Sequence, residues 1–153
     1  MTRTTHKRLF SLLLAVGLIW PVAAVAQQIC RSESEVPSST PTSRFTDHGN
    51  GTVTDQHTGL MWAKCTSGLS GALCDQGTVV VVTWQGALDL GARSVHAGYD
   101  DWRLPNIKEL RSIVEQRCQN PAINQDAAVF PNTLGSSFWS SSTSFILSTN
   151  AWF

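Results

Sequence analysis

The sequence predicts an α+β domain in which short antiparallel strands and two helices are stapled by disulfides. Three observations support this prediction. An amphipathic segment starts at a capping motif around Asn106, an Asn-Gly turn at Asn50-Gly51 separates two alternating segments, and all four cysteines follow the apolar N-terminal stretch. A chain that mixes helical and strand periods in this way is typical of a small domain with both kinds of element.

Residues 1–26 have the pattern of a secretory signal peptide. Three basic residues precede an apolar run over 9–19, and Ala24-Val25-Ala26 offers a small-x-small cleavage site. The run is shorter than the roughly 20 apolar residues of a spanning helix, and no second run of that length follows. We therefore expect a secreted or periplasmic protein without membrane insertion after cleavage.

Charge argues against nucleic acid as a partner. The whole chain has 11 basic and 11 acidic residues, but Arg3, Lys7 and Arg8 lie in the expected signal peptide, so the remainder has a formal charge of −3. No run of Lys and Arg is present that could follow a phosphate backbone.

Residues 27–43 are polar and interrupted by prolines, which predicts an arm or linker before a domain over 44–153. The domain starts with a hairpin, because Asn50-Gly51 suits positive φ and lies between the alternating segments 45–47 and 52–55. A third strand is expected at 60–63.

The four cysteines predict two disulfides in an oxidising compartment. We favour Cys65–Cys74, which closes a Gly/Ser-rich loop, and Cys30–Cys118, which ties the arm to the end of the second helix. A zinc site is the competing interpretation, but the chain has no Cys-x-x-Cys and no histidine close to a cysteine.

Two helices and two further strands are expected in the second half. The β-branched run 78–82 predicts a strand, followed by a helix that Thr83 caps and that reaches Val95. Gly86 and Gly91 weaken this helix, so it needs tertiary packing or a close backbone approach.

The second helix starts at Asn106, where Glu109 completes a capping box. Ile107, Leu110, Ile113 and Val114 fall on one side of it, which predicts packing against the core. Residues 136–142 are expected to form a strand.

Several motifs occur in the order found in one known family. They are Arg44–Asp47, Gly51–Asp55, Thr58–Trp62, Thr83–Trp84, Gly98–Pro105, Glu109–Leu110 and Phe138–Ser141. From about Arg44 to its end the chain resembles the Lcl C-terminal domain family, named after the Legionella collagen-like adhesin. The resemblance implies an exported bacterial domain with a C-type-lectin-like fold. The family's named member is a trimeric adhesin that binds sulfated glycosaminoglycans, so a homotrimer and a sulfated glycan are among the expectations.

The chain departs from the family pattern at its end, where members continue through further strands. We therefore expect a domain that lacks its last strands, or one whose last strands come from a partner, with an open sheet edge. The turn Arg103-Leu104-Pro105 is also similar to an element of formylglycine-generating enzymes, but the region that would carry their cysteine pair is missing.

No catalytic residue can be argued, and we expect no cofactor and no metal. The segment 47–58 lacks the closing glutamate of a calcium loop, and the histidines lie without ligand companions. Six residues are expected to be structural: Trp62, Trp84, Trp102, Arg103, Pro105 and Trp139. A buried Arg103 would need a partner such as Asp100, Asp101 or another nearby acid.

The predicted function is a non-catalytic module that binds a polysaccharide or surface glycan in adhesion. The candidate contacts are Lys64, Arg93, Lys108, Arg111, Arg117 and Trp152. One alternative is a structural or assembly domain that docks onto another exported protein through its open sheet edge, and a second is a formylglycine-generating-enzyme-like oxidase.

Overall fold

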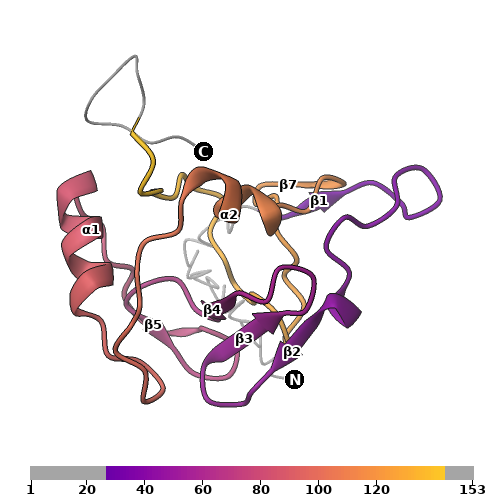
Figure 1. Ribbon diagram of the computed structural model, residues 1–153. Coiled ribbons are helices and arrows are strands. Elements are labelled where there is room, and N and C mark those ends of the chain that lie inside the picture. The colour runs from indigo at the N-terminus through magenta and orange to yellow at the C-terminus, as the bar shows by residue number, and fades with distance from the viewer. Residues whose placement is uncertain (1–26, 144–153) are drawn as a thin grey trace, which may run out of the picture.

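The computed structural model describes residues 27–143, so the expected signal peptide lies outside the described residues. The described chain is an α+β fold of short antiparallel strands, two helices and two disulfides (Figure 1). The helices are α1 (Trp84–Arg93) and α2 (Ile107–Ser112), and a 3-10 turn, η1, covers Thr42–Arg44. This confirms the predicted class.

The predicted hairpin and third strand form an antiparallel sheet in the order β2 (Phe45–Asp47), β3 (Thr52–Asp55) and β4 (Met61–Ala63). Phe45 pairs with Asp55, and Val53 pairs with Trp62. The turn is stabilised by Asp47 Oδ1, which accepts from the amide of Gly49 at 2.9 Å. The local turn signal was therefore sufficient to predict the pairing of β2 with β3.

Two smaller sheets have two strands each. β1 (Ile29–Cys30) pairs with β7 (Cys118–Gln119), and β5 (Leu69–Ser70) pairs with β6 (Gln76–Gly77) inside the cysteine loop. The disulfides are Cys30–Cys118 and Cys65–Cys74, the two pairs that the sequence favoured. Figure 1 shows β1, β7 and α2 on the opposite side of the molecule from β2 and β3.

The core lies between β3, the end of α2 and the loop that follows β7. Val53, Ile113, Val129 and Phe130 are buried together, and Phe45 meets Phe130 edge-on with ring centroids 5.6 Å apart. Leu110 and Ile123 pack against this cluster. The apolar side predicted for α2 therefore does contact the core.

Both helices have the predicted caps. Asn106 Oδ1 accepts from the amides of Lys108 and Glu109 at 2.9 and 3.0 Å, and Glu109 Oε2 accepts from the Asn106 amide at 2.8 Å. Thr83 Oγ1 accepts from the Gly86 amide at 3.2 Å. The close approach expected at a glycine is present at Gly91, where an added Cβ would lie 2.8 Å from the amide nitrogen of Leu104.

The predicted helix ends were wrong by a few residues. α1 ends at Arg93, and Val95 is 75% exposed, so nothing buries the apolar side chain that extended the predicted pattern. α2 ends at Ser112, with Ile113 as its C-cap, because Val114 instead pairs with Ile123 in an isolated antiparallel bridge.

Two predicted strands do not form. Residues 78–82 have no strand partner in the described chain, and β-branched residues do not make a strand without one. Residues 136–142 bond to other elements instead: the Ser141 amide donates to the carbonyl of Pro105 at 2.8 Å, and Ser142 Oγ accepts from the Ile107 amide at 3.1 Å.

Candidate ligand site

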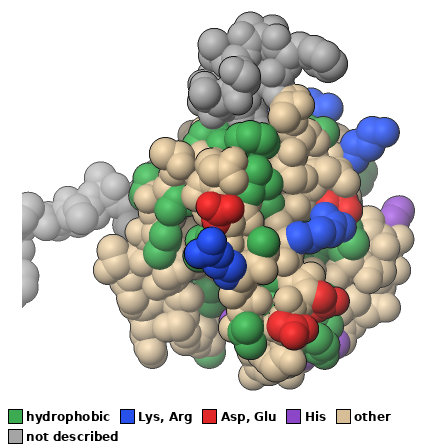
Figure 2. Space-filling model, turned by 60° about the vertical axis from the view of Figure 1, so that its left-hand side comes forward, with side chains coloured by type: hydrophobic (Ala, Val, Ile, Leu, Met, Phe, Trp, Pro, Cys, Tyr) green, Lys and Arg blue, Asp and Glu red, His purple; other side chains and the backbone are tan. Residues whose placement is uncertain are grey.

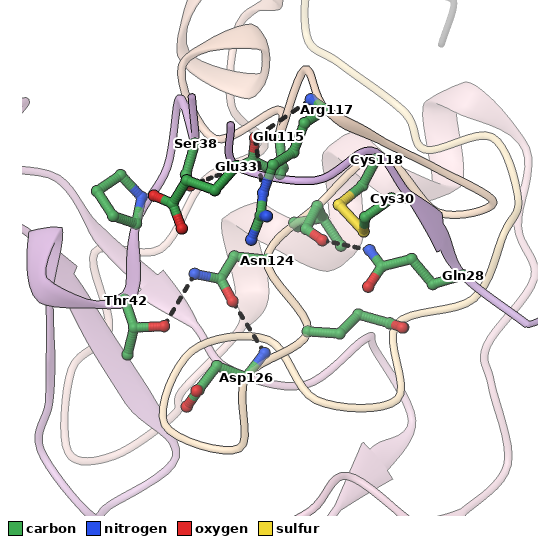
Figure 3. A pocket seen from close by; sticks show the side chains of 13 residues that line it. Gln28, Cys30, Glu33, Ser38, Thr42, Glu115, Arg117, Cys118, Asn124 and Asp126 are labelled. Atoms are coloured by element: carbon green, nitrogen blue, oxygen red, sulfur yellow. Dashed lines mark hydrogen bonds and ion pairs between the residues drawn. A yellow bond between two sulfur atoms is a disulfide. The ribbon is translucent and has the colours of Figure 1, made fainter. Parts of the chain in front are cut away.

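A polar hollow of about 390 Å³ opens between the arm, residues 27–43, and the segment 115–126 that follows α2 (Figure 3). The arm contributes Gln28, Glu33 and Thr42, and the opposite wall contributes Arg117 and Asn124. The size is within the range of small-molecule sites, roughly 300–1,000 Å³. The hollow is therefore our candidate ligand site.

Amide side chains across the hollow are fixed by backbone partners. Gln28 Nε2 donates to the carbonyls of Pro121 and Ile123 at 2.8 and 2.6 Å. Asn124 Nδ2 donates to the Thr40 carbonyl at 2.8 Å and to Thr42 Oγ1 at 3.2 Å. These bonds join the two walls and hold both amides in one orientation.

Glu115 binds the end of the arm, residues 38–40. Its carboxylate is 2% exposed and accepts from Ser38 Oγ at 2.5 Å, from the Ser39 amide at 3.1 Å, and from the Thr40 amide and Oγ1 at 3.0 and 2.9 Å. Burial opposes ionisation, but these donors outweigh it and lower the pKa of Glu115 to about 2. The carboxylate is therefore charged at neutral pH.

Arg117 is the cation of the hollow. Its guanidinium points toward Asn124 in Figure 3, and its side chain keeps 28% of its exposure. Nε lies 4.0 Å from Glu115 Oε1 and is buried without a hydrogen-bond partner among the described residues. Glu33 and Asp126 also line the hollow. With Glu115, three carboxylates accompany one guanidinium, so the site has no cationic excess.

The model of the Lcl C-terminal domain family matches residues 51–153, well over half of the chain. The chain belongs to the Lcl C-terminal domain family. No curated protein and no solved structure is similar enough to this chain to count as a match. The family points to an exported, adhesin-like domain, and the two disulfides are consistent with a periplasmic or extracellular protein.

The Lcl C-terminal domain does not bring its predicted cationic contacts together. Of these residues, Arg117 alone lines the hollow. Arg93, Lys108 and Arg111 are exposed on the two helices. Figure 2 shows one face on which the Lys and Arg side chains are separated from one another, with acidic side chains among them. Trp152 lies outside the described residues.

Lys64 is occupied elsewhere in the domain. Its ammonium lies 2.6 Å from Asp47 Oδ2, and its side chain is only 8% exposed. This ion pair joins the end of β4 to the hairpin turn and lowers the pKa of Asp47 even though burial opposes it. Lys64 is therefore a nearly buried ion-pair partner and not an exposed cation.

The tryptophans hold backbone segments in place. The indole nitrogens of Trp84, Trp102 and Trp139 donate to the carbonyls of Ser140, His96 and Val82 at 2.8, 3.1 and 2.9 Å. Trp62 packs against the core. Among the described residues, no aromatic side chain lines the hollow.

Arg103 pairs with Glu109 through two bonds of 2.7 Å, whereas Asp100 and Asp101 were the partners named first from the sequence. Its side chain is 59% exposed, so no buried cation needed a partner here. The bonds from Arg103, assisted by the Asn106 amide, lower the pKa of Glu109 to about 2.

Sequence reasoning missed Gln28, Glu115 and Asn124 as site residues. Each is held by partners far away in the chain, at separations of 93 for Gln28, 84 for Asn124 and 75 for Glu115, and neither polar type nor spacing marks them in the sequence. In the described part of the chain no group of three or more His, Cys, Asp or Glu side chains is arranged to hold a metal ion. Within residues 27–143 no helix is both long and apolar enough to cross a membrane.

Proposed function

We propose that this domain is an exported, non-catalytic binding module that recognises a polysaccharide or surface glycan in the polar hollow. The observation that carries the proposal is the hollow itself, in which the Gln28 and Asn124 amides are held by the framework beside hydroxyl groups and the Arg117 guanidinium. Groups that are already oriented lose little side-chain entropy when a ligand binds. Amide oxygens and hydroxyls can also accept further bonds, which suits a ligand rich in hydroxyl groups.

The lining also favours one kind of sugar contact over another. Stacking of a pyranose needs an aromatic face, and the lining residues include none. Recognition would therefore depend on hydrogen bonds from loops, in keeping with the C-type-lectin-like fold that we propose for the domain. Such contacts are individually weak, so several copies on one glycan, as in a homotrimer, would raise the avidity.

Charge favours a neutral glycan over a sulfated one. In the part of the lining that the structure describes, Arg117 is the one cation, beside Glu33, Glu115 and Asp126. A sulfate would meet three carboxylates around one guanidinium, and like charges in a partly buried site repel. A sulfated ligand would instead use the exposed Lys108 and Arg111, with strong dependence on salt.

The test is thermal unfolding of the chain with a panel of neutral and sulfated polysaccharides at low and physiological salt. A ligand of the native state raises the midpoint. We expect a neutral polysaccharide to raise it, Arg117→Ala to abolish the shift, and Lys108→Ala, an exposed cation outside the hollow, to leave it unchanged. A shift that Lys108→Ala removes and Arg117→Ala does not would refute the hollow as the site. No shift with any polysaccharide would refute glycan binding.

A further inference from the structure

We propose that residues 27–37 are a flap over the hollow, held closed by Cys30–Cys118 and released by thiol–disulfide exchange with an external dithiol. The claim that the flap controls glycan binding rests on the proposed function. The flap itself rests on how the arm is attached.

Two parts of the arm are attached to the domain by different interactions, residues 38–40 by hydrogen bonds and residues 27–37 mainly by a disulfide. Ser38, Ser39 and Thr40 are bonded to the Glu115 carboxylate. Residues 27–37 are attached by the disulfide, by the pairing of β1 with β7, by the two Gln28 bonds and by the Arg31 amide, which donates to the Arg117 carbonyl at 2.9 Å. A pair of two-residue strands is marginal in water without further support.

The disulfide therefore decides whether residues 27–37 stay in place. It links positions 88 residues apart, so its loss adds entropy mainly to the unfolded chain, whereas in the folded domain it frees only the short segment that precedes Ser38. The Glu115 bonds persist at neutral pH because that carboxylate stays charged. Release of the disulfide would free 27–37 and leave 38–40 attached, which places the hinge near Val36 and Pro37.

Opening of the flap would remove one wall of the ligand site. Gln28, Cys30 and Glu33 line the hollow from the flap side. Without them Asn124 and Arg117 remain on an open surface, where hydrogen bonds to a sugar compete with water. We expect reduction to weaken glycan binding about tenfold, the loss of roughly one such bond.

The geometry favours exchange at this disulfide over the other one. Each disulfide has one buried cysteine, Cys118 at 9% and Cys74 at 1% exposure, but Cys30 is exposed whereas Cys65 is only half-exposed. The Cys65–Cys74 bond also closes a short loop, with a sequence separation of 9. A dithiol attacks as its thiolate at Cys30 Sγ, which forms a mixed disulfide and releases the Cys118 thiolate, which takes up a proton. The second thiol of the reagent then displaces Cys30 as a thiol, so the dithiol is oxidised to a disulfide and both cysteines are reduced.

The test is hydrogen exchange of the chain before and after limited treatment with dithiothreitol. In a Cys65→Ser/Cys74→Ser variant only Cys30–Cys118 can react, and in the wild type alkylation of released thiols identifies the bond that opens first. We expect Cys30 and Cys118 to be labelled first. Exchange of the Arg31 amide should then quicken at least tenfold, while the Thr40 and Leu110 amides keep their protection.

Labelling of Cys65 and Cys74 before Cys30 and Cys118 would overturn the assignment of the exchange to this disulfide. Unchanged exchange of the Arg31 amide after complete reduction would overturn the flap. Equal loss of protection at Leu110, which lies in α2, would also overturn it, because the disulfide would then hold the whole fold. An opened flap with unchanged glycan affinity would overturn control of the site. A chain that binds no glycan in either state would refute the proposed function and this control together, whereas the exchange rates would still decide the flap.

Discussion

Arg44 and Asp55 form a two-point ion pair that closes the base of the first hairpin. Arg44 Nε donates to Asp55 Oδ1 at 2.6 Å and Nη2 donates to Oδ2 at 2.5 Å. The Asp55 side chain is fully buried, and Arg44 keeps 13% of its exposure. Arg44 Nη2 also donates to the Ser112 carbonyl at 3.0 Å, so the pair connects the hairpin to the end of α2.

Asp55→Asn should therefore lower the free energy of unfolding by about 3 kcal/mol, because it leaves the buried Arg44 guanidinium uncompensated. Urea denaturation at pH 7 measures the change. Asp101→Asn, at an exposed aspartate, is the matched control and should stay within about 0.5 kcal/mol of the wild type. Equal stabilities for the two variants would contradict the structural role of the ion pair.

Glu115→Ala should release residues 38–40 of the arm from the domain. The change removes the acceptor of Ser38, Ser39 and Thr40, whose bonds to a charged group contribute about 1.5–3 kcal/mol each. Because the released arm lets these donors bond to water, we expect a net loss equal to one or two such bonds, roughly 3 kcal/mol. Limited proteolysis should then cut within residues 31–43. Glu33→Ala, which changes an exposed carboxylate of the same arm, should leave both stability and the cleavage pattern unchanged.

Acid should destabilise the domain. Donors to the two carboxylates lower the pKa of Asp55 from 3.8, and that of Glu115 from 4.5, to about 2, in spite of burial. A lowered folded-state pKa contributes stability above the unfolded-state pKa, and this contribution is lost as the pH falls from about 4.5 toward 2. Each group should contribute about 2–3 kcal/mol. The urea midpoint should drop steeply between pH 5 and pH 2.5, and less steeply for Asp55→Asn. A midpoint that is flat over this range would refute the assignment.

Asn106→Ala should cost about 1 kcal/mol, because the amides of Lys108 and Glu109 lose their acceptor at the start of α2. Asn106→Asp keeps a carboxyl oxygen in the same place and should remain close to the wild type. The measurement is the denaturation midpoint of the three proteins. A loss as large in the aspartate variant would show that the amide group, and not the cap, is what matters.

Gly91→Ala should destabilise the domain by about 1–3 kcal/mol, although alanine ordinarily favours a helix interior. The new Cβ would meet the Leu104 amide nitrogen at 2.8 Å and the Arg103 carbonyl carbon at 3.2 Å, and backbone atoms cannot rotate away. Thermal unfolding of Gly91→Ala and of Ala92→Ser, at the exposed neighbour, tests this. A stabilised Gly91→Ala would mean that α1 and the 103–104 segment do not approach so closely.

The local elements of this protein could be predicted from its sequence. The turn at Asn50-Gly51 and the caps at Thr83 and Asn106 work through bonds that span no more than a few residues, so the residues that make them are adjacent in the sequence. The two disulfides are also the pairs predicted from the sequence. The prediction was feasible because four cysteines allow only three sets of pairings.

Only the tertiary structure decided which of the predicted strands and side chains are paired with distant parts of the chain. Among the described residues, the β-branched run 78–82 forms no strand and makes a single backbone–backbone bond, from Val80 to Ser67, toward the segment before β5. Lys64, expected at a ligand surface, is paired with Asp47. The hollow arises because Glu115 binds the arm 75 residues earlier in the chain. Sequence patterns record propensity and spacing within an element, whereas such contacts depend on which distant segments pack together, and that is settled by the folded chain as a whole.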